Sequence, residues 1–96
     1  MKILILPSVR DDLAEGFQFY ERQMEFLGGY FLDSIFSDID SLRLYAGIHP
    51  KVFGNHRLLS KRLPYAIYYH AEESETVFVK AVLDCRYPSE GRQRQA

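Results

Sequence analysis

The sequence predicts a single α+β domain in which two amphipathic helices pack on an antiparallel sheet. Its 96 residues, 47% of them hydrophobic, suit one domain with one modest core. Apolar residues recur at helical spacing in the first half of the chain and follow strand-like patterns in the second. The charged fraction, 26%, is that of ordinary globular proteins. We therefore expect one domain over residues 1–96 and no bulk disorder.

The chain is expected to begin with a short strand and a long helix. Lys2 to Leu6 form a β-type run, and Pro7 with Ser8 ends it and starts the helix. The apolar residues of this helix share one face: Val9, Leu13, Phe17, Tyr20, Met24 and Leu27. We expect Gly28 and Gly29 to break the helix, because glycine adopts the left-handed conformation common at helix ends.

A second helix is predicted directly after the two glycines. Its apolar face contains Phe31, Leu32, Ile35, Ile39, Leu42 and Ala46. Gly47, followed by Ile48-His49-Pro50, supplies the stop signal. Two amphipathic helices joined by a tight turn form an αα-hairpin.

Three antiparallel strands are expected in the remainder, at Val52 to Ser60, Leu63 to His70 and Thr76 to Arg86. The polar cluster Glu72 to Glu75 reads as the loop between the last two. The segment Ser89 to Ala96 is polar, and we expect it to be a flexible tail.

A register for the last hairpin follows if Tyr69 faces Val77. The core pairs are then Ile67 with Val79, Tyr65 with Ala81, and Leu63 with Leu83. The other face places Arg62 opposite Asp84 and Tyr68 opposite Phe78, with Lys80 and Arg86 alongside. Cys85 falls on the core face with Leu83, so we expect a buried structural thiol.

Charge is distributed unevenly along the chain. Residues 1–40 hold eight acidic and three basic residues, a net charge of −5, whereas residues 41–71 hold no acid. The five basic residues of that middle segment are Arg43, Lys51, Arg57, Lys61 and Arg62. One side of the molecule is therefore expected to be basic, either as a solvated face or as a surface for an anionic partner.

The sequence also indicates a cytoplasmic protein without cofactors. The single cysteine cannot form an intrachain disulfide, the N-terminal apolar run is too short for a signal peptide, and no stretch is long enough to span a membrane. No phosphate-binding loop or recognisable nucleophile is present. The histidines at 49, 56 and 70 lack the spacing of metal ligands, so no metal is expected.

Two arginines are candidates for phosphate binding. Guanidinium groups of Arg62 and Arg86 on neighbouring strands can bind phosphate bidentately, and aromatic rings nearby can stack on bases. The nearby aromatic residues are Tyr68, Phe78 and Tyr87. In the alternative interpretation, Arg62 pairs with Asp84 across the hairpin and Arg86 caps a strand end.

The order of elements and four segments together resemble the RelE/ParE superfamily of toxins from type II toxin-antitoxin systems. The segments are Leu13-Ala14-Glu15-Gly16-Phe17 with Tyr20, Ala46-Gly47-Ile48-His49, Lys61-Arg62-Leu63-Pro64-Tyr65-Ala66-Ile67-Tyr68-Tyr69, and Val82-Leu83-Asp84-Cys85-Arg86. The resemblance covers nearly the whole chain and is greatest for the ParE-like, plasmid-stabilisation branch.

The resemblance implies a RelE-like fold with sheet order 1-4-3-2 and the helices on one face. It also implies a cognate antitoxin whose C-terminal segment folds around the toxin. RNase members of the superfamily have arginines that match Arg62 and Arg86. Of the further groups around their site, only Tyr87 has a counterpart here, and no general base is identified.

Three functions are compatible with this resemblance. The first is a toxin that arrests growth by binding a target such as DNA gyrase. The second is a ribosome-associated mRNA endonuclease that uses Arg62, Arg86 and Tyr87. The third is a degenerate toxin that keeps only antitoxin binding. The residues expected to contact antitoxin or target are Arg57, Lys61, Tyr68, Phe78 and Lys80. Operator DNA is expected to be bound only through the antitoxin.

Overall fold

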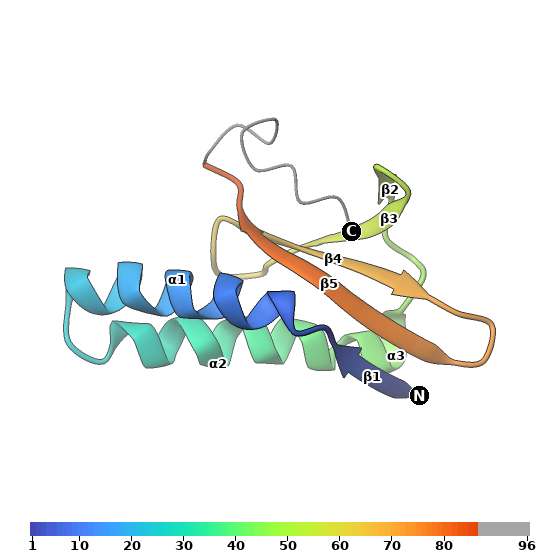
Figure 1. Ribbon diagram of the computed structural model, residues 1–96, viewed down its shortest axis with the longest axis horizontal. Helices are drawn as coiled ribbons and strands as arrows, with labels where there is room; N and C mark the ends of the chain where they lie inside the picture. The colour runs from blue at the N-terminus through green and yellow to red at the C-terminus, as the bar shows by residue number, and fades with distance from the viewer. Residues whose placement is uncertain (87–96) are drawn as a thin grey trace.

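The computed structural model describes residues 1–86, which form one strand, three helices and four further strands in chain order (Figure 1). The elements are β1 (Lys2–Ile5), α1 (Ser8–Gln23), α2 (Leu27–Asp40), α3 (Leu42–Tyr45), β2 (Lys51–Val52), β3 (Asn55–Leu59), β4 (Tyr65–Ala71) and β5 (Thr76–Asp84). Tyr87 and the expected tail at 89–96 lie outside the described residues.

The sheet has the order β1-β5-β4-β3-β2, with β1 parallel to β5 and every other neighbouring pair antiparallel. This confirms the predicted 1-4-3-2 arrangement. The expected first strand of the meander is divided into β2 and β3 by a turn at Phe53 and Gly54, both of which have positive φ. The division adds one strand at the edge and leaves the order of the others unchanged.

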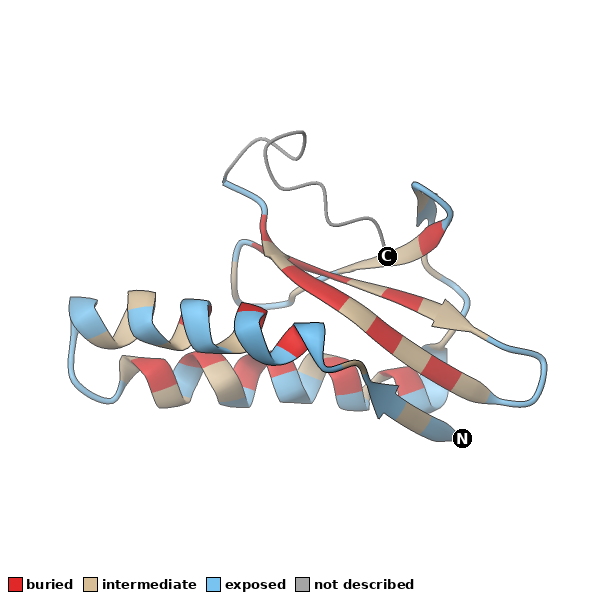
Figure 2. Cartoon of the chain, viewed as in Figure 1, coloured by how far each residue is buried: buried red, intermediate tan, exposed pale blue. Residues whose placement is uncertain are grey.

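The helices form a layer that lies against one face of the sheet, as predicted (Figure 1). Along β5, buried and partly exposed residues alternate except at Ala81 and Val82, which are both buried, because successive side chains point to opposite faces (Figure 2). The core between the layers contains Val9, Phe31, Ile35, Ile39, Leu42, Tyr65, Ile67, Tyr69, Val77, Val79 and Val82. Among the described residues, no helix combines the length and the apolar character needed to cross a membrane.

The break between the helices does not fall at Gly28 and Gly29. Helix α1 ends at Gln23, α2 begins at Leu27, and both glycines lie inside α2. Phe26, with φ 73°, supplies the left-handed residue instead. Gly28 has a different role, because a Cβ on it would lie 2.6 Å from a ring carbon of Phe17 on α1. The glycine therefore permits close helix packing and does not end a helix.

The predicted register of the last hairpin is wrong. Near the turn Val77 pairs with Ala71 and not with Tyr69, so the register differs by two residues, and further along β5 contains a β-bulge. Tyr68 pairs with Ala81 and Tyr69 with Val79, which leaves Lys80 as an extra residue without a partner on β4. Beyond the bulge, the face that points to the helices changes from odd to even residues of β5. The pairs on that side are Tyr69 with Val79, Ile67 with Val82, and Tyr65 with Asp84.

Three further expectations fail with the register. Arg62 is not opposite Asp84, and Tyr68 is not opposite Phe78, whose partner on β4 is His70. Cys85 follows the strand and is exposed, so it is not the buried core thiol that was expected. The error for Phe78 follows from the two-residue offset at the turn, and the bulge shifts the register at Asp84 by one further residue. The error for Cys85 arises because β5 ends at Asp84.

Candidate functional site

Arg62 lies on the loop between β3 and β4, and a carboxylate on α2 fixes this loop. The hydroxyl of Ser60 donates to Asp38 Oδ2 at 2.6 Å, and the backbone N–H of Lys61 donates to Asp38 Oδ1 at 3.4 Å. The N–H of Leu63 in turn donates to Ser60 Oγ at 3.3 Å. Lys61 and Arg62 are both exposed. Two basic side chains therefore extend into solvent from a loop with an anchored backbone.

Arg86 has a different environment, because Asp84 binds its guanidinium. Nε donates to Asp84 Oδ1 at 2.9 Å and Nη2 donates to Asp84 Oδ2 at 2.7 Å, which is a bidentate pair. The backbone N–H of Arg86 also donates to Asp84 Oδ1 at 2.9 Å. The hydrogen bonds that Arg86 donates to Asp84 hold the pKa of its guanidinium above the usual range. The partner of Asp84 is thus Arg86, and the expected pair with Arg62 is wrong.

The guanidinium of Arg86 also lies over two aromatic rings of α1. Its central carbon is 4.9 Å from the ring centroid of Phe19 and 5.9 Å from that of Tyr20. Tyr20 stacks on Phe31 in the helical layer, and burial raises the pKa of its hydroxyl. Arg86 therefore ties the end of β5 to α1. No sequence pattern indicates these contacts, because Arg86 is far from Phe19 and Tyr20 along the chain.

Arg62 and Arg86 belong to the same end of the sheet. The N–H of Cys85 donates to the carbonyl of Pro64 at 2.8 Å, which joins the end of β5 to the loop before β4. Both arginines are exposed, but the guanidinium of Arg86 has a bidentate carboxylate partner in Asp84. Tyr87, the third residue predicted for a nuclease site, lies outside the described residues.

The face of the sheet that points away from the helices carries three of the residues predicted to contact a partner. Tyr68 on β4 lies beside Arg57 on β3, whose Nε donates to the Tyr68 hydroxyl at 3.2 Å. Phe78 on β5 lies on the same face, opposite His70. Arg57 Nη2 also approaches the sulfur of Cys85 at 3.7 Å. We call Arg57, Tyr68 and Phe78 the open-face group.

The other two predicted contact residues flank the open-face group. Lys61 lies on the loop that Asp38 fixes, and Lys80 is the extra residue of the β5 bulge. The carbonyl of Lys80 accepts a hydrogen bond from Ser8 Oγ at 3.4 Å. The bulge therefore has a contact with α1 as well as with the sheet.

Two of the three histidines meet at Tyr69. The Tyr69 hydroxyl accepts from the N–H of Gly47 at 2.9 Å and lies 2.5 Å from Nδ1 of His49. His56 stacks on the Tyr69 ring, with centroids 5.0 Å apart, and its Nδ1 donates to the carbonyl of His49 at 2.6 Å. Burial, with a smaller contribution from His56, lowers the pKa of His49. Burial also raises the pKa of Tyr69.

The third histidine, His70, is at the surface and lies 3.2 Å from a carboxylate oxygen of Glu72. Within residues 1–86, no three His, Cys, Asp or Glu side chains come together in an arrangement that would hold a metal ion. His49 and His56 thus pack around Tyr69, and His70 contacts Glu72 at the surface.

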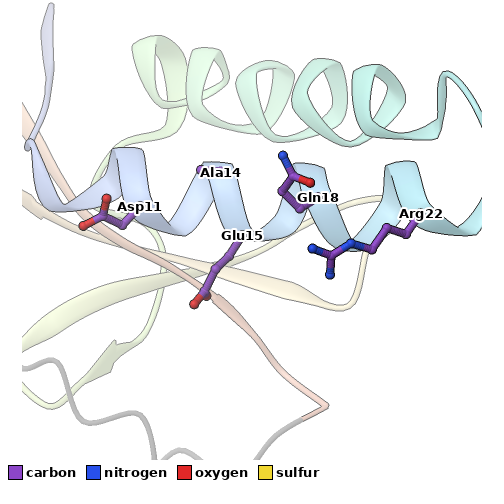
Figure 3. Close-up of a pocket in the computed structure, with 5 residues that line it drawn as sticks. All are labelled: Asp11, Ala14, Glu15, Gln18 and Arg22. Carbon is purple, nitrogen blue, oxygen red and sulfur yellow. The ribbon is translucent and has the colours of Figure 1, made fainter.

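Five residues on the exposed face of α1 line a depression (Figure 3). Its lining residues are Asp11, Ala14, Glu15, Gln18 and Arg22. All five come from a single helix, and none belongs to the residues predicted from the sequence. Within residues 1–86, its walls come from α1 alone, and we assign it no function.

Comparisons with known proteins identify the fold. No protein-family profile matches the sequence, and no curated protein matches it. Among solved structures, the chain is similar to a chain of the chromosomal ParDE TA system from P. aeruginosa, with a TM-score of 0.75 and 15% sequence identity. The match covers 85% of this chain and 92% of the other. The fold is therefore ParE-like, as the sequence resemblance implied.

Proposed function

We propose that this protein is the toxin of a type II toxin-antitoxin system, acts in the cytoplasm and is neutralised by a cognate antitoxin. The observation that carries the proposal is the likeness of its fold to a chain of a ParDE TA system over 85% of its length. The sequence segments that resemble RelE/ParE toxins support the same conclusion independently of the fold.

The open-face group, with Lys61 and Lys80, is the proposed contact surface for the antitoxin. The charge of residues 41–71, five bases and no acid, suits an acidic segment that folds onto the toxin. Arg57 and Tyr68 are held together by their hydrogen bond, so a partner meets a surface that is already ordered.

The proposed toxin arrests growth by binding a target, and the proposed target is DNA gyrase. The environment of Arg86 agrees better with this mode of arrest than with RNA cleavage. In RNA cleavage, Arg86 would stabilise a developing phosphorane charge. Its guanidinium already has a bidentate carboxylate partner in Asp84 and two aromatic neighbours. Asp84 takes two of the five guanidinium N–H groups and places a negative charge where a phosphate would bind, so we assign Arg86 a structural role.

An mRNA endonuclease remains the second candidate, because one observation favours it. Arg62 and Lys61 extend from an anchored loop within a segment that contains no acid. Such a surface suits the RNA backbone. In this alternative Arg62 is the residue that binds phosphate.

Inducible expression in a bacterial host separates the two candidates. Growth and transcript ends are followed for the wild type, Arg62→Ala and Arg10→Ala, where Arg10 is an exposed arginine on α1. Purified protein is assayed in parallel for inhibition of gyrase supercoiling. We expect arrest by all three proteins, intact transcripts and inhibited gyrase. New transcript ends that disappear with Arg62→Ala would establish the endonuclease, and no arrest by the wild type would contradict both.

Antitoxin binding is tested with the product of the small gene expected beside this one. Arg57→Glu and Tyr68→Ala should each weaken its rescue of growth, because they remove charge and contact area from the open-face group. Arg10→Glu makes the same charge change as Arg57→Glu, on α1, and should leave rescue intact. Equal rescue for all variants would place the antitoxin elsewhere.

A further inference from the structure

Two exposed phenylalanines occupy a backbone conformation that suits glycine. Within residues 1–86, the non-glycine residues with positive φ are Phe26 at 73°, Phe53 at 55° and Glu75 at 63°. Such positions normally take Gly, Asn or Asp, because a Cβ is crowded there. Phe26 is 79% exposed and Phe53 62% exposed, so core packing does not offset the strain. An exposed, strained aromatic side chain suggests a function outside the fold.

Phe26 is held in this conformation by a carboxylate of α1. Glu21 Oε2 accepts a hydrogen bond from the N–H of Phe26 at 3.1 Å, and Oε1 accepts one from the N–H of Gly28 at 2.9 Å. These are N–H groups at the start of α2 that lack partners within the helix. The turn is therefore fixed by two hydrogen bonds, and the ring of Phe26 is presented outward without support from the core.

Two further large apolar side chains are exposed near Phe26. Met24, the residue directly after α1, is 62% exposed, and Tyr30 in the first turn of α2 is 46% exposed. The turn that carries Phe26 lies at the end of the helical layer, beyond the sheet, and its residues are exposed (Figures 1 and 2). We call Met24, Phe26 and Tyr30 the hairpin tip. Aromatic residues and methionine are enriched in the anchors of protein interfaces.

The charges near the hairpin tip are acidic. Residues 21–33, which surround the turn, contain Glu21, Glu25 and Asp33 against Arg22, a net charge of −2. Asp33 and Glu25 are exposed. A protein that receives the hairpin tip would therefore gain from basic residues around its pocket. This chemistry is opposite to that of the basic segment proposed to bind the antitoxin, so the two surfaces fit different partners.

We propose that the hairpin tip is the surface by which the toxin engages its target, and that the target is a protein with an apolar pocket bordered by Lys or Arg. Phe26 is the central anchor, and the strain in its backbone is retained because glycine at this position would remove the ring. The inference rests on the proposed function, since it identifies which surface of the toxin contacts the target.

The experiment compares Phe26→Gly, Phe26→Tyr and Met24→Ser, expressed in the bacterial host without antitoxin, at matched protein levels. Phe53→Gly is the matched control, because it relieves the same strain at another exposed phenylalanine. Phe26→Gly should need an inducer concentration about tenfold or more above that of the wild type to arrest growth. Its Tm should equal that of the wild type or exceed it by up to about 4 °C. Met24→Ser should weaken arrest, whereas Phe26→Tyr and Phe53→Gly should retain it.

Charge supplies a second test that does not alter the turn. Asp33→Lys should weaken arrest, because it places a base opposite the basic border of the pocket. Full arrest by Phe26→Gly and Met24→Ser, with the wild type also arresting growth, overturns the inference and leaves the proposed function intact. Equal loss of arrest in Phe53→Gly also overturns it, since the effect would not be specific to the hairpin tip. No arrest by the wild type overturns the proposed function and this inference with it.

Discussion

Asp12 on α1 accepts a hydrogen bond through Oδ2 from the backbone N–H of Val82 on β5, at 2.9 Å. The two residues are 70 positions apart, and Asp12 is only 7% exposed. Val82 is the second residue after Lys80, the extra residue of the bulge that sets which side chains of β5 face the core. A buried carboxylate thus holds the strand where its register changes.

Removal of this carboxylate should destabilise the fold. Asp12→Ala leaves the buried N–H of Val82 without this acceptor, and we expect a loss of about 2 kcal/mol in the free energy of unfolding. Urea unfolding followed by circular dichroism measures it. Asp11→Ala changes the exposed neighbouring acid and should cost less than about 1 kcal/mol, from the helix dipole alone. Similar midpoints for the two variants would show that the bulge does not depend on Asp12.

The helix crossing gives a second prediction, because two glycines allow α1 and α2 to approach. A Cβ on Gly16 would lie 2.1 Å from the ring tip of Phe31, which is fully buried. Gly16→Ala should therefore destabilise the protein by about 2 kcal/mol or more. Gly29→Ala is the matched control, since nothing lies within 4 Å of its added Cβ.

For Gly29→Ala we expect a gain of roughly 0.5 to 1 kcal/mol, because alanine is the better helix former. Both variants are measured by thermal unfolding. If Gly29→Ala destabilised the protein as much as Gly16→Ala does, helix packing could not be the cause.

The contrast between the two arginines gives a third prediction. Arg86→Ala removes two side-chain hydrogen bonds to Asp84 and the contacts with Phe19 and Tyr20. We expect a loss of about 2 kcal/mol in stability. Arg62→Ala changes an exposed side chain on a loop and should cost less than about 0.5 kcal/mol. Thermal unfolding of both variants tests whether Arg86 is structural. Equal stability of the two variants would contradict this role and leave Arg86 a candidate for phosphate binding.

Periodicity predicted the layers of this fold well, and it failed where a single long-range contact decides the local backbone. The apolar face of the second helix, from Phe31 to Leu42, and the order of the strands are confirmed. The bulge at Lys80 is not visible in a strand that alternates normally on both sides of it. Asp12, which belongs to the first helix, binds β5 two residues beyond it.

The position of the helix break failed for a related reason. Gly28 and Gly29 carry the usual signal for a helix end, yet the left-handed residue is Phe26. Glu21 stabilises that turn from α1, and Gly28 is needed where Phe17 approaches.

The basic segment could be predicted because charge is additive along the chain. The pairing of Arg86 with Asp84, two residues before it, could not be distinguished from an interstrand pair.

The contact between His49 and Tyr69 predicts how stability depends on pH. Because the Tyr69 hydroxyl accepts from the N–H of Gly47, its own proton is available to Nδ1 of His49, which must be unprotonated to accept it. Burial lowers the pKa of His49 below its ordinary 6.5 in the folded state, so between that lowered pKa and about 6.5 the unfolded chain binds more protons. Stability contributed by neutral His49 is present above this window and is lost as the pH falls through it.

We therefore expect the Tm of the wild type to fall between about pH 7.5 and about pH 5, and His49→Gln to reduce that fall. Calorimetry across this range measures it. Tyr69→Phe should lower the Tm even at about pH 7.5, since the N–H of Gly47 loses its acceptor. His70→Gln changes a surface histidine and should keep the pH dependence of the wild type. A dependence that persists in His49→Gln but disappears in His70→Gln would assign the titration to His70 and contradict the prediction.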